Sequence, residues 1–97
     1  MAKIIAQEAV TITNAATLIA TEVPDRVSIL IQNNGTQVVY VGDSAVATTT
    51  GIILKAASAA DIGDGGSVEF PGEGAVYGIV ASGTSQVRVL HEGTGVV

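Results

Sequence analysis

The stretch Arg26-Val-Ser-Ile-Leu-Ile-Gln32 decides the fold class of this chain. Its alternate residues Val27, Ile29 and Ile31 fall on one face of an extended strand, because successive side chains of a β-strand point to opposite faces. β-Branched side chains of this kind pack well on a pleated sheet. The stretch therefore predicts a strand with Val27, Ile29 and Ile31 in the core.

The residues after this strand predict a tight hairpin. Asn33-Asn34-Gly35 follows directly, and Asn-Gly tolerates the positive φ angles of a two-residue hairpin turn. We therefore expect Val38-Val-Tyr-Val41 to return antiparallel to residues 26–32, with Val39 and Val41 in the same core.

A second hairpin is expected near the C-terminus. The β-rich runs Ala75-Val-Tyr-Gly-Ile-Val-Ala81 and Gln86-Val-Arg-Val-Leu-His91 flank the short polar segment Ser82-Gly-Thr-Ser85. Val87 and Val89 share one face of the last strand and are expected to join the core.

The remaining sequence extends the all-β prediction. Val, Ile and Thr make up 34 of the 97 residues, and no window of helical length carries an apolar stripe at helical spacing. Shorter strands are expected at residues 3–8, 10–13, 17–20, 52–54 and 67–70. Eight or nine short strands in a single domain, residues 1–97, predict a compact two-sheet antiparallel β-sandwich of jelly-roll type.

The composition excludes several classes of function. The chain has no cysteine and one histidine, so disulfide frameworks and multi-histidine metal sites are absent. Its four basic residues and net charge of −5 argue against binding nucleic acid. No apolar run reaches the length of about 18 residues that crosses a membrane. We therefore expect neither nucleic acid nor membrane as a partner.

An acidic, glycine-rich segment invites a calcium interpretation. With Asp61 in the first position of an EF-hand loop, positions 3, 5 and 12 would be glycines, which offer no side-chain ligand. The standard motif therefore fails. An irregular calcium loop through Asp61, Asp64 and Glu69 is the alternative to a solvated turn, and we predict no metal site.

Catalytic motifs are also missing. The sequence has no phosphate-binding Gly-Lys-Ser/Thr triplet and no Gly-x-Ser-x-Gly nucleophile elbow. His91 is followed by Glu92, which a strand directs to the opposite face. We therefore predict that the protein is not an enzyme and uses no cofactor. Tyr40 and Tyr77 are the plausible aromatic platforms for a sugar, which leaves a carbohydrate-binding β-sandwich module as a third alternative.

Two isoleucine pairs are candidate interface residues. Charged residues make up 13% of the chain against about 25% in an ordinary soluble domain, so part of the surface is expected to be covered. In each of the pairs Ile4-Ile5 and Ile52-Ile53, one side chain can face the core while the other faces away. We also expect residues 1–13 to act as an N-terminal strand or arm at an interface.

Several of these segments resemble a group of known proteins. The chain resembles small virion structural proteins of tailed bacteriophages in five segments. They are Arg26-Val-Ser-Ile-Leu-Ile-Gln-Asn33, Val39-Tyr-Val-Gly42, Thr48-Thr-Thr-Gly-Ile52, Val76-Tyr-Gly-Ile-Val-Ala-Ser-Gly83 and the strand that starts at Gln86. The resemblance implies a non-enzymatic capsid decoration, or cement, protein. Such a protein is made in the cytoplasm of the bacterial host and becomes part of the virion.

The same resemblance implies the partners. A decoration protein binds the outside of the head as a homo-oligomer, typically a trimer, and contacts the major capsid protein. A small tail, collar or fibre component of a phage particle is the alternative within the same group.

Overall fold

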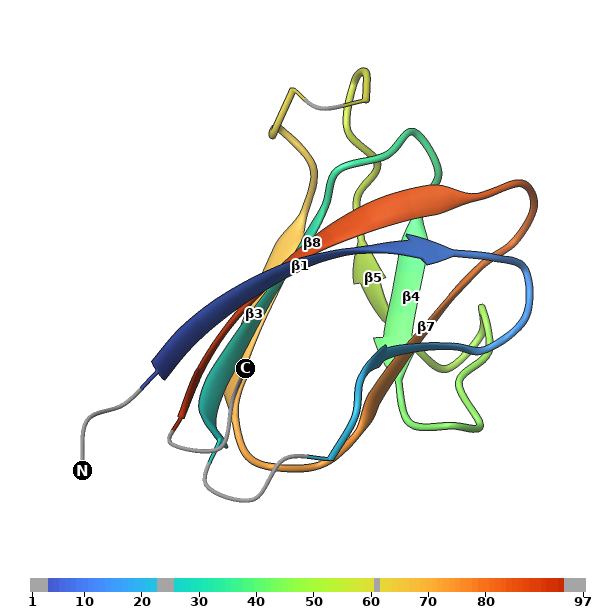
Figure 1. Ribbon diagram of the computed structural model, residues 1–97. Coiled ribbons are helices and arrows are strands. Elements are labelled where there is room, and N and C mark those ends of the chain that lie inside the picture. The colour runs from blue at the N-terminus through green and yellow to red at the C-terminus, as the bar shows by residue number, and fades with distance from the viewer. Residues whose placement is uncertain (1–3, 23–25, 61, 94–97) are drawn as a thin grey trace.

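The computed structural model describes residues 4–22, 26–60 and 62–93, with only the backbone described for residues 4–6 (Figure 1). These residues form eight strands, and none of them lies in a helix. The strands are β1 (Ile4–Ile12), β2 (Thr17–Ala20), β3 (Arg26–Asn33), β4 (Val39–Gly42), β5 (Ile52–Leu54), β6 (Ser67–Pro71), β7 (Val76–Val80) and β8 (Ser85–Gly93). The all-β prediction is confirmed.

The strands form two antiparallel sheets of four, which we call the first and the second sheet (Figure 1). The first sheet has the order β1-β8-β3-β6, and the second has the order β2-β7-β4-β5. The pairs β1·β8, β2·β7, β3·β6 and β4·β5 are nested within one another along the chain. This nested pairing is the wrapping of a jelly roll, so the predicted sandwich and its topology agree with the structure.

Both predicted hairpins are wrong. β3 lies in the first sheet and β4 in the second, and β7 and β8 are divided in the same way. The Asn-Asn-Gly segment therefore crosses between sheets, and its backbone amides bond to distant segments. Asn33 N donates to Gly66 O at 2.8 Å, and Asn34 N donates to Gln86 O at 2.8 Å. Asn33, Asn34 and Gly35, which are typical of tight turns, here form a connection between the two sheets.

Gly35 is required for a different reason from the one expected. Positive φ angles occur at Gly63, Gly72 and Gly83 among the described glycines, and not at Gly35. A Cβ atom at Gly35 would overlap the Ser85 side chain and would lie 2.8 Å from the backbone nitrogen of Gln86. The glycine is therefore needed for the close approach of two chain segments.

The core between the sheets contains most of the expected residues. Ile29 and Ile31 are fully buried, and the buried set also includes Val39, Val41, Val87 and Val89. Val27 contradicts the prediction, because its side chain is 40% exposed. The pairing of β3 with β8 shifts between Arg26 and Ser28, and this irregularity places Arg26 instead of Val27 in a buried position.

The two strands expected at the N-terminus form one strand. β1 pairs with β8 without interruption from Ile4 opposite Gly93 to Ile12 opposite Ser85. The N-terminal end of the expected strand at Lys3 lies outside the described residues.

Candidate functional site

The outer face of the second sheet carries five uncharged, largely apolar side chains, which we call the apolar face. In the register of the sheet, Leu18 lies opposite Tyr77, while Tyr40 lies between Ile79 and Ile53. Directly opposite residues share a face, and so do residues two apart in one strand. The apolar face therefore consists of Leu18, Tyr40, Ile53, Tyr77 and Ile79.

The apolar face is open to solvent over much of its area. Ile53 is 67% exposed and Leu18 is 46% exposed, while the two tyrosines and Ile79 are half-buried. The buried Val46, from the β4–β5 loop, packs over Gly42 at one end of the face, where a Cβ atom on Gly42 would meet it at 3.0 Å. None of the five side chains carries a formal charge. Removing their apolar surface from water is therefore favourable in free energy.

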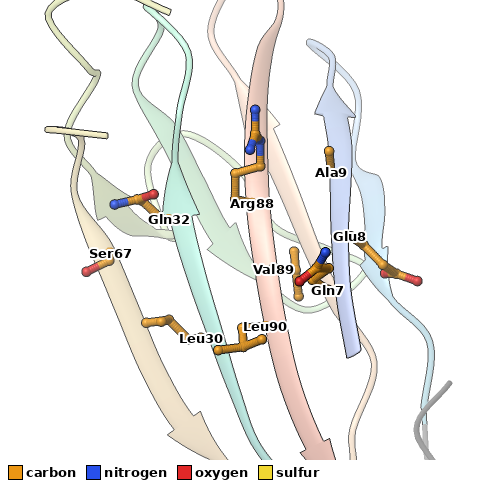
Figure 2. Close-up of a pocket in the computed structure, with 9 residues that line it drawn as sticks. All are labelled: Gln7, Glu8, Ala9, Leu30, Gln32, Ser67, Arg88, Val89 and Leu90. Carbon is orange, nitrogen blue, oxygen red and sulfur yellow. The ribbon is translucent and has the colours of Figure 1, made fainter. Parts of the chain in front are cut away.

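The outer face of the first sheet is polar by comparison (Figure 2). Ala9, Arg88, Gln32 and Ser67 lie in one row across its four strands, and Leu90 and Leu30 are opposite each other in the next row. A shallow hollow of about 560 Å³ covers this face. It is lined by Gln7, Glu8, Ala9, Leu30, Gln32, Ser67, Arg88, Val89 and Leu90.

The hollow lacks the groups that nucleophilic catalysis needs. Ser67 offers a hydroxyl, but no histidine lines the hollow to act as its base. Arg88 Nε donates to Gln86 Oε1 at 3.0 Å, on the neighbouring part of its own strand. No aromatic ring lines the hollow, so it also lacks a stacking platform for a sugar.

His91 is a buried polar residue near the end of β8. Its side chain is buried on the inner face of β8, while Glu92 lies on the opposite face, as predicted. The nearest carboxylate is that of Glu8 on β1, with Oε2 at 3.8 Å from His91 Nε2. Neither ring nitrogen has a hydrogen-bond partner among the described residues. The separation of 3.8 Å between His91 Nε2 and Glu8 Oε2 is longer than a hydrogen bond.

Arg26 is a buried cation with a structural role. Its Nε donates to Gly72 O at 2.9 Å and its Nη1 to Thr21 O at 3.1 Å, and its Nη2 also donates to Gly74 O. Burial lowers the pKa of the Arg26 guanidinium from its ordinary value, although Glu73 acts in the opposite direction. The side chain thus fastens the β6–β7 loop to the chain that follows β2, a role that the sequence did not indicate.

The acidic segment forms a hydrogen-bonded turn. Ser58 donates to the Asp64 carboxylate from its backbone nitrogen at 2.9 Å and from its hydroxyl at 2.6 Å. These bonds hold the pKa of Asp64 below its ordinary value. Glu69 lies away from this turn, opposite Leu30 in the sheet, and Asp61 is outside the described residues. In the described part of the chain, no three metal-binding side chains gather.

The predicted interface isoleucines divide into two groups. Ile52 lies opposite the buried Val41, so it points inward as expected, and Ile53 points outward on the apolar face. Ile52 is nevertheless 61% exposed, because it stands at the border of the sandwich in a shallow groove with Val68 and Phe70. Ile4 and Ile5 begin β1, and their side chains lie outside what the structure describes.

The sequence analysis named Tyr40 and Tyr77 of the apolar face as platforms for a sugar, and it did not name Leu18 or Ile79. Val39-Tyr-Val41 is apolar at successive positions, and so is Ile29-Leu-Ile31 in the first sheet. Leu18-Ile19 and Ile79-Val80 repeat this feature on β2 and β7. Strands that are apolar on both faces are typical of sheets covered on both sides. Successive apolar residues occur in both sheets, so this feature alone does not identify the second sheet.

Comparison of the chain with protein families, with curated proteins and with solved structures finds no match. None of the described residues belongs to a helix that could span a lipid bilayer. The geometry of the two outer faces is therefore the basis for assigning a function.

Proposed function

We propose that the protein is a non-enzymatic structural protein of a tailed-bacteriophage particle. In this proposal it is a capsid decoration protein that binds the outside of the head as a homo-oligomer and stabilises it. The observation that carries the proposal is the apolar face, an uncharged outer surface on a small jelly roll. Large exposed apolar patches on soluble proteins mark contact sites for other macromolecules.

The composition of the apolar face supports a protein contact. Tyrosine is enriched at the buried centres of protein interfaces, and charged residues are depleted there. The apolar face has both properties, since it contains Tyr40 and Tyr77 and no charged side chain. In a chain of net charge −5, this is the surface that another protein can approach without burying a carboxylate.

The resemblance to virion structural proteins supplies the biological setting. It implies several copies, typically three, around a symmetry axis of the head, each in contact with the major capsid protein. Many weak contacts made at once raise the overall affinity without one strong site. Such an arrangement suits a chain whose exposed apolar side chains are mainly aliphatic.

Binding to undecorated phage heads tests the proposal. The parent protein should co-sediment with the heads and raise the temperature at which they release DNA. Ile53→Glu should abolish binding, because it places a carboxylate on the most exposed side chain of the apolar face, within the contact. Leu90→Glu is the matched control, since Leu90 is 43% exposed on the other outer face, and it should bind normally.

The alternative functions give different results. Binding to isolated tails and not to heads would replace the decoration role by that of a tail, collar or fibre component. Binding to a glycan array that is lost with Tyr40→Ala would favour a carbohydrate-binding module. Equal binding of heads by both glutamate variants would remove the apolar face from the contact.

A further inference from the structure

We propose that β1 pairs edge to edge with β1 of a second copy of this chain, so that the two first sheets become one eight-stranded sheet. The proposal rests on the proposed function, because it names a contact that makes the homo-oligomer. It gives a dimer in place of the trimer that the resemblance implies. It is carried by the four edge strands of the sandwich, which differ sharply in how they are protected.

Three of the four edges are unsuited to pairing. β6 carries Glu69 and ends with Pro71, which has no amide hydrogen to donate. β5 has three residues, and β2 has four residues with an irregular register after Leu18. Short strands, prolines, charges and irregularities are the devices by which proteins prevent sheet edges from associating.

β1 has few of these devices. It is nine residues long, contains no proline and no lysine or arginine, and has a single charged residue, Glu8. Its pairing with β8 runs through all nine residues without a bulge. No other described strand pairs with its outer edge, so β1 is an edge strand of the first sheet. Figure 1 shows it as a long strand beside β8. No described segment bonds to the backbone groups on that edge, so they can bond another strand.

A second β1 is the occupant that fits this edge. Each chain carries a net charge of −5, so two copies associate best through a segment that is poor in acidic residues. β1 contributes one carboxylate per copy. Antiparallel pairing about a two-fold axis also uses the same edge twice and closes after two copies, which prevents fibre growth.

Charge restricts the position of the two-fold axis. An axis through Glu8 would place two carboxylates directly opposite each other, which is unfavourable across paired strands. An axis at Gln7 places two exposed amides opposite each other, and amides can hydrogen-bond. We therefore place the axis at Gln7, with residues 4–10 of the two copies paired.

This arrangement has a consequence for the apolar face. A two-fold axis perpendicular to the joined sheet keeps the outer faces of both first sheets on one side. The apolar faces of the two copies then lie together on the opposite side. The dimer would present a doubled binding surface to a single partner surface, such as a capsid.

Cross-linking tests the pairing directly, because the chain has no cysteine of its own. Gln7→Cys places two thiols at opposed positions, where the Cα separation in paired strands suits a disulfide. We expect a disulfide-linked dimer of Gln7→Cys under mild oxidation. Ser82→Cys, in the exposed β7–β8 loop, is the control and should stay monomeric in a denaturing gel. Equal cross-linking of the two variants would overturn the pairing.

Native mass provides the second readout. The parent should have twice the monomer mass, and Gln7→Lys should reduce it to the monomer because two ammonium groups would face each other. Ser67→Lys, on the exposed edge strand β6, should remain a dimer. A trimer, a monomeric parent or a dimer that survives Gln7→Lys would overturn the pairing through β1. Head binding by the parent would still decide the decoration proposal separately.

Discussion

Asn33 Oδ1 accepts a hydrogen bond of 2.8 Å from Ser85 Oγ, which fastens the end of β3 to the start of β8. The side-chain nitrogen of Asn33, Nδ2, also donates to Leu54 O at 3.1 Å and to Gln37 O at 2.7 Å. Leu54 belongs to the second sheet, whereas Asn33 and Ser85 belong to the first. One buried side chain therefore joins the two sheets at this end of the sandwich.

Replacing this amide should weaken the fold strongly. Asn33→Leu fills a similar volume but leaves the Leu54 carbonyl and the Ser85 hydroxyl without their partner. We expect a loss of about 3 kcal/mol in the free energy of unfolding, measured by urea denaturation. Ser85→Ala removes one of the bonds and should cost about 1 kcal/mol. An Asn33→Leu protein as stable as the parent would contradict the inter-sheet role of Asn33.

Gly35→Ala should destabilise the protein through a steric clash. The added methyl group would meet the Ser85 side chain and the backbone of Gln86. We expect a cost of about 1–3 kcal/mol, which is typical of overpacking. Gly74→Ala is the matched control, because a Cβ atom there meets nothing within 4 Å and its φ angle is not positive. Similar melting temperatures for the two variants would show that the contact at Gly35 is not tight.

The irregular start of β3 predicts different effects for two neighbouring apolar residues. Ile29→Ala should reduce the free energy of unfolding by about 2–5 kcal/mol, since Ile29 is fully buried. Val27→Ala should change it by no more than about 0.5 kcal/mol, because the bulge turns Val27 toward solvent. Thermal melts of both variants test this contrast. A large loss at Val27 would mean that the regular alternation continues to the start of the strand.

The Ser58–Asp64 turn should lose its stabilising effect in acid. The folded state lowers the pKa of Asp64, so the contribution is complete above the ordinary aspartate pKa of about 3.9. It is lost as the pH falls through the lower pKa of the folded state. Ser58→Ala removes the hydroxyl hydrogen bond and should raise the pKa of Asp64 toward its ordinary value, as measured by NMR titration. If the pKa of Asp64 is the same in Ser58→Ala as in the parent, a group other than the Ser58 hydroxyl lowers it.

Local sequence pattern predicted the strands and most of the core. Alternation placed Ile29 and Ile31 correctly, because the two-residue period of a strand is a local property. The pattern could not assign each strand to a sheet. Asn-Gly favours a tight turn, but in this chain Gly35 is selected by its contact with Ser85, which lies fifty residues further along the chain.

The apolar face, the proposed binding surface, depends on the same long-range information. The five residues of the apolar face come from four strands, and only the order β2-β7-β4-β5 brings them to one face. The interface prediction named Ile53 from its own strand and did not include the other four residues of the face, which are Leu18, Tyr40, Tyr77 and Ile79. The exposure of Val27 likewise follows from a register shift between β3 and β8, which the sequence of β3 alone does not predict.

The nested pairing of the strands determines how the chain can fold. β4 and β5 are the one pair of described strands adjacent both in sequence and in a sheet, separated by residues 43–51. Every other pairing closes a longer loop, and the longest loop is closed when β1 meets β8. Loop-closure entropy and high contact order make such pairings slow to form. Folding should therefore begin at β4–β5 and proceed outward through β3–β6 and β2–β7, with β1 joining last.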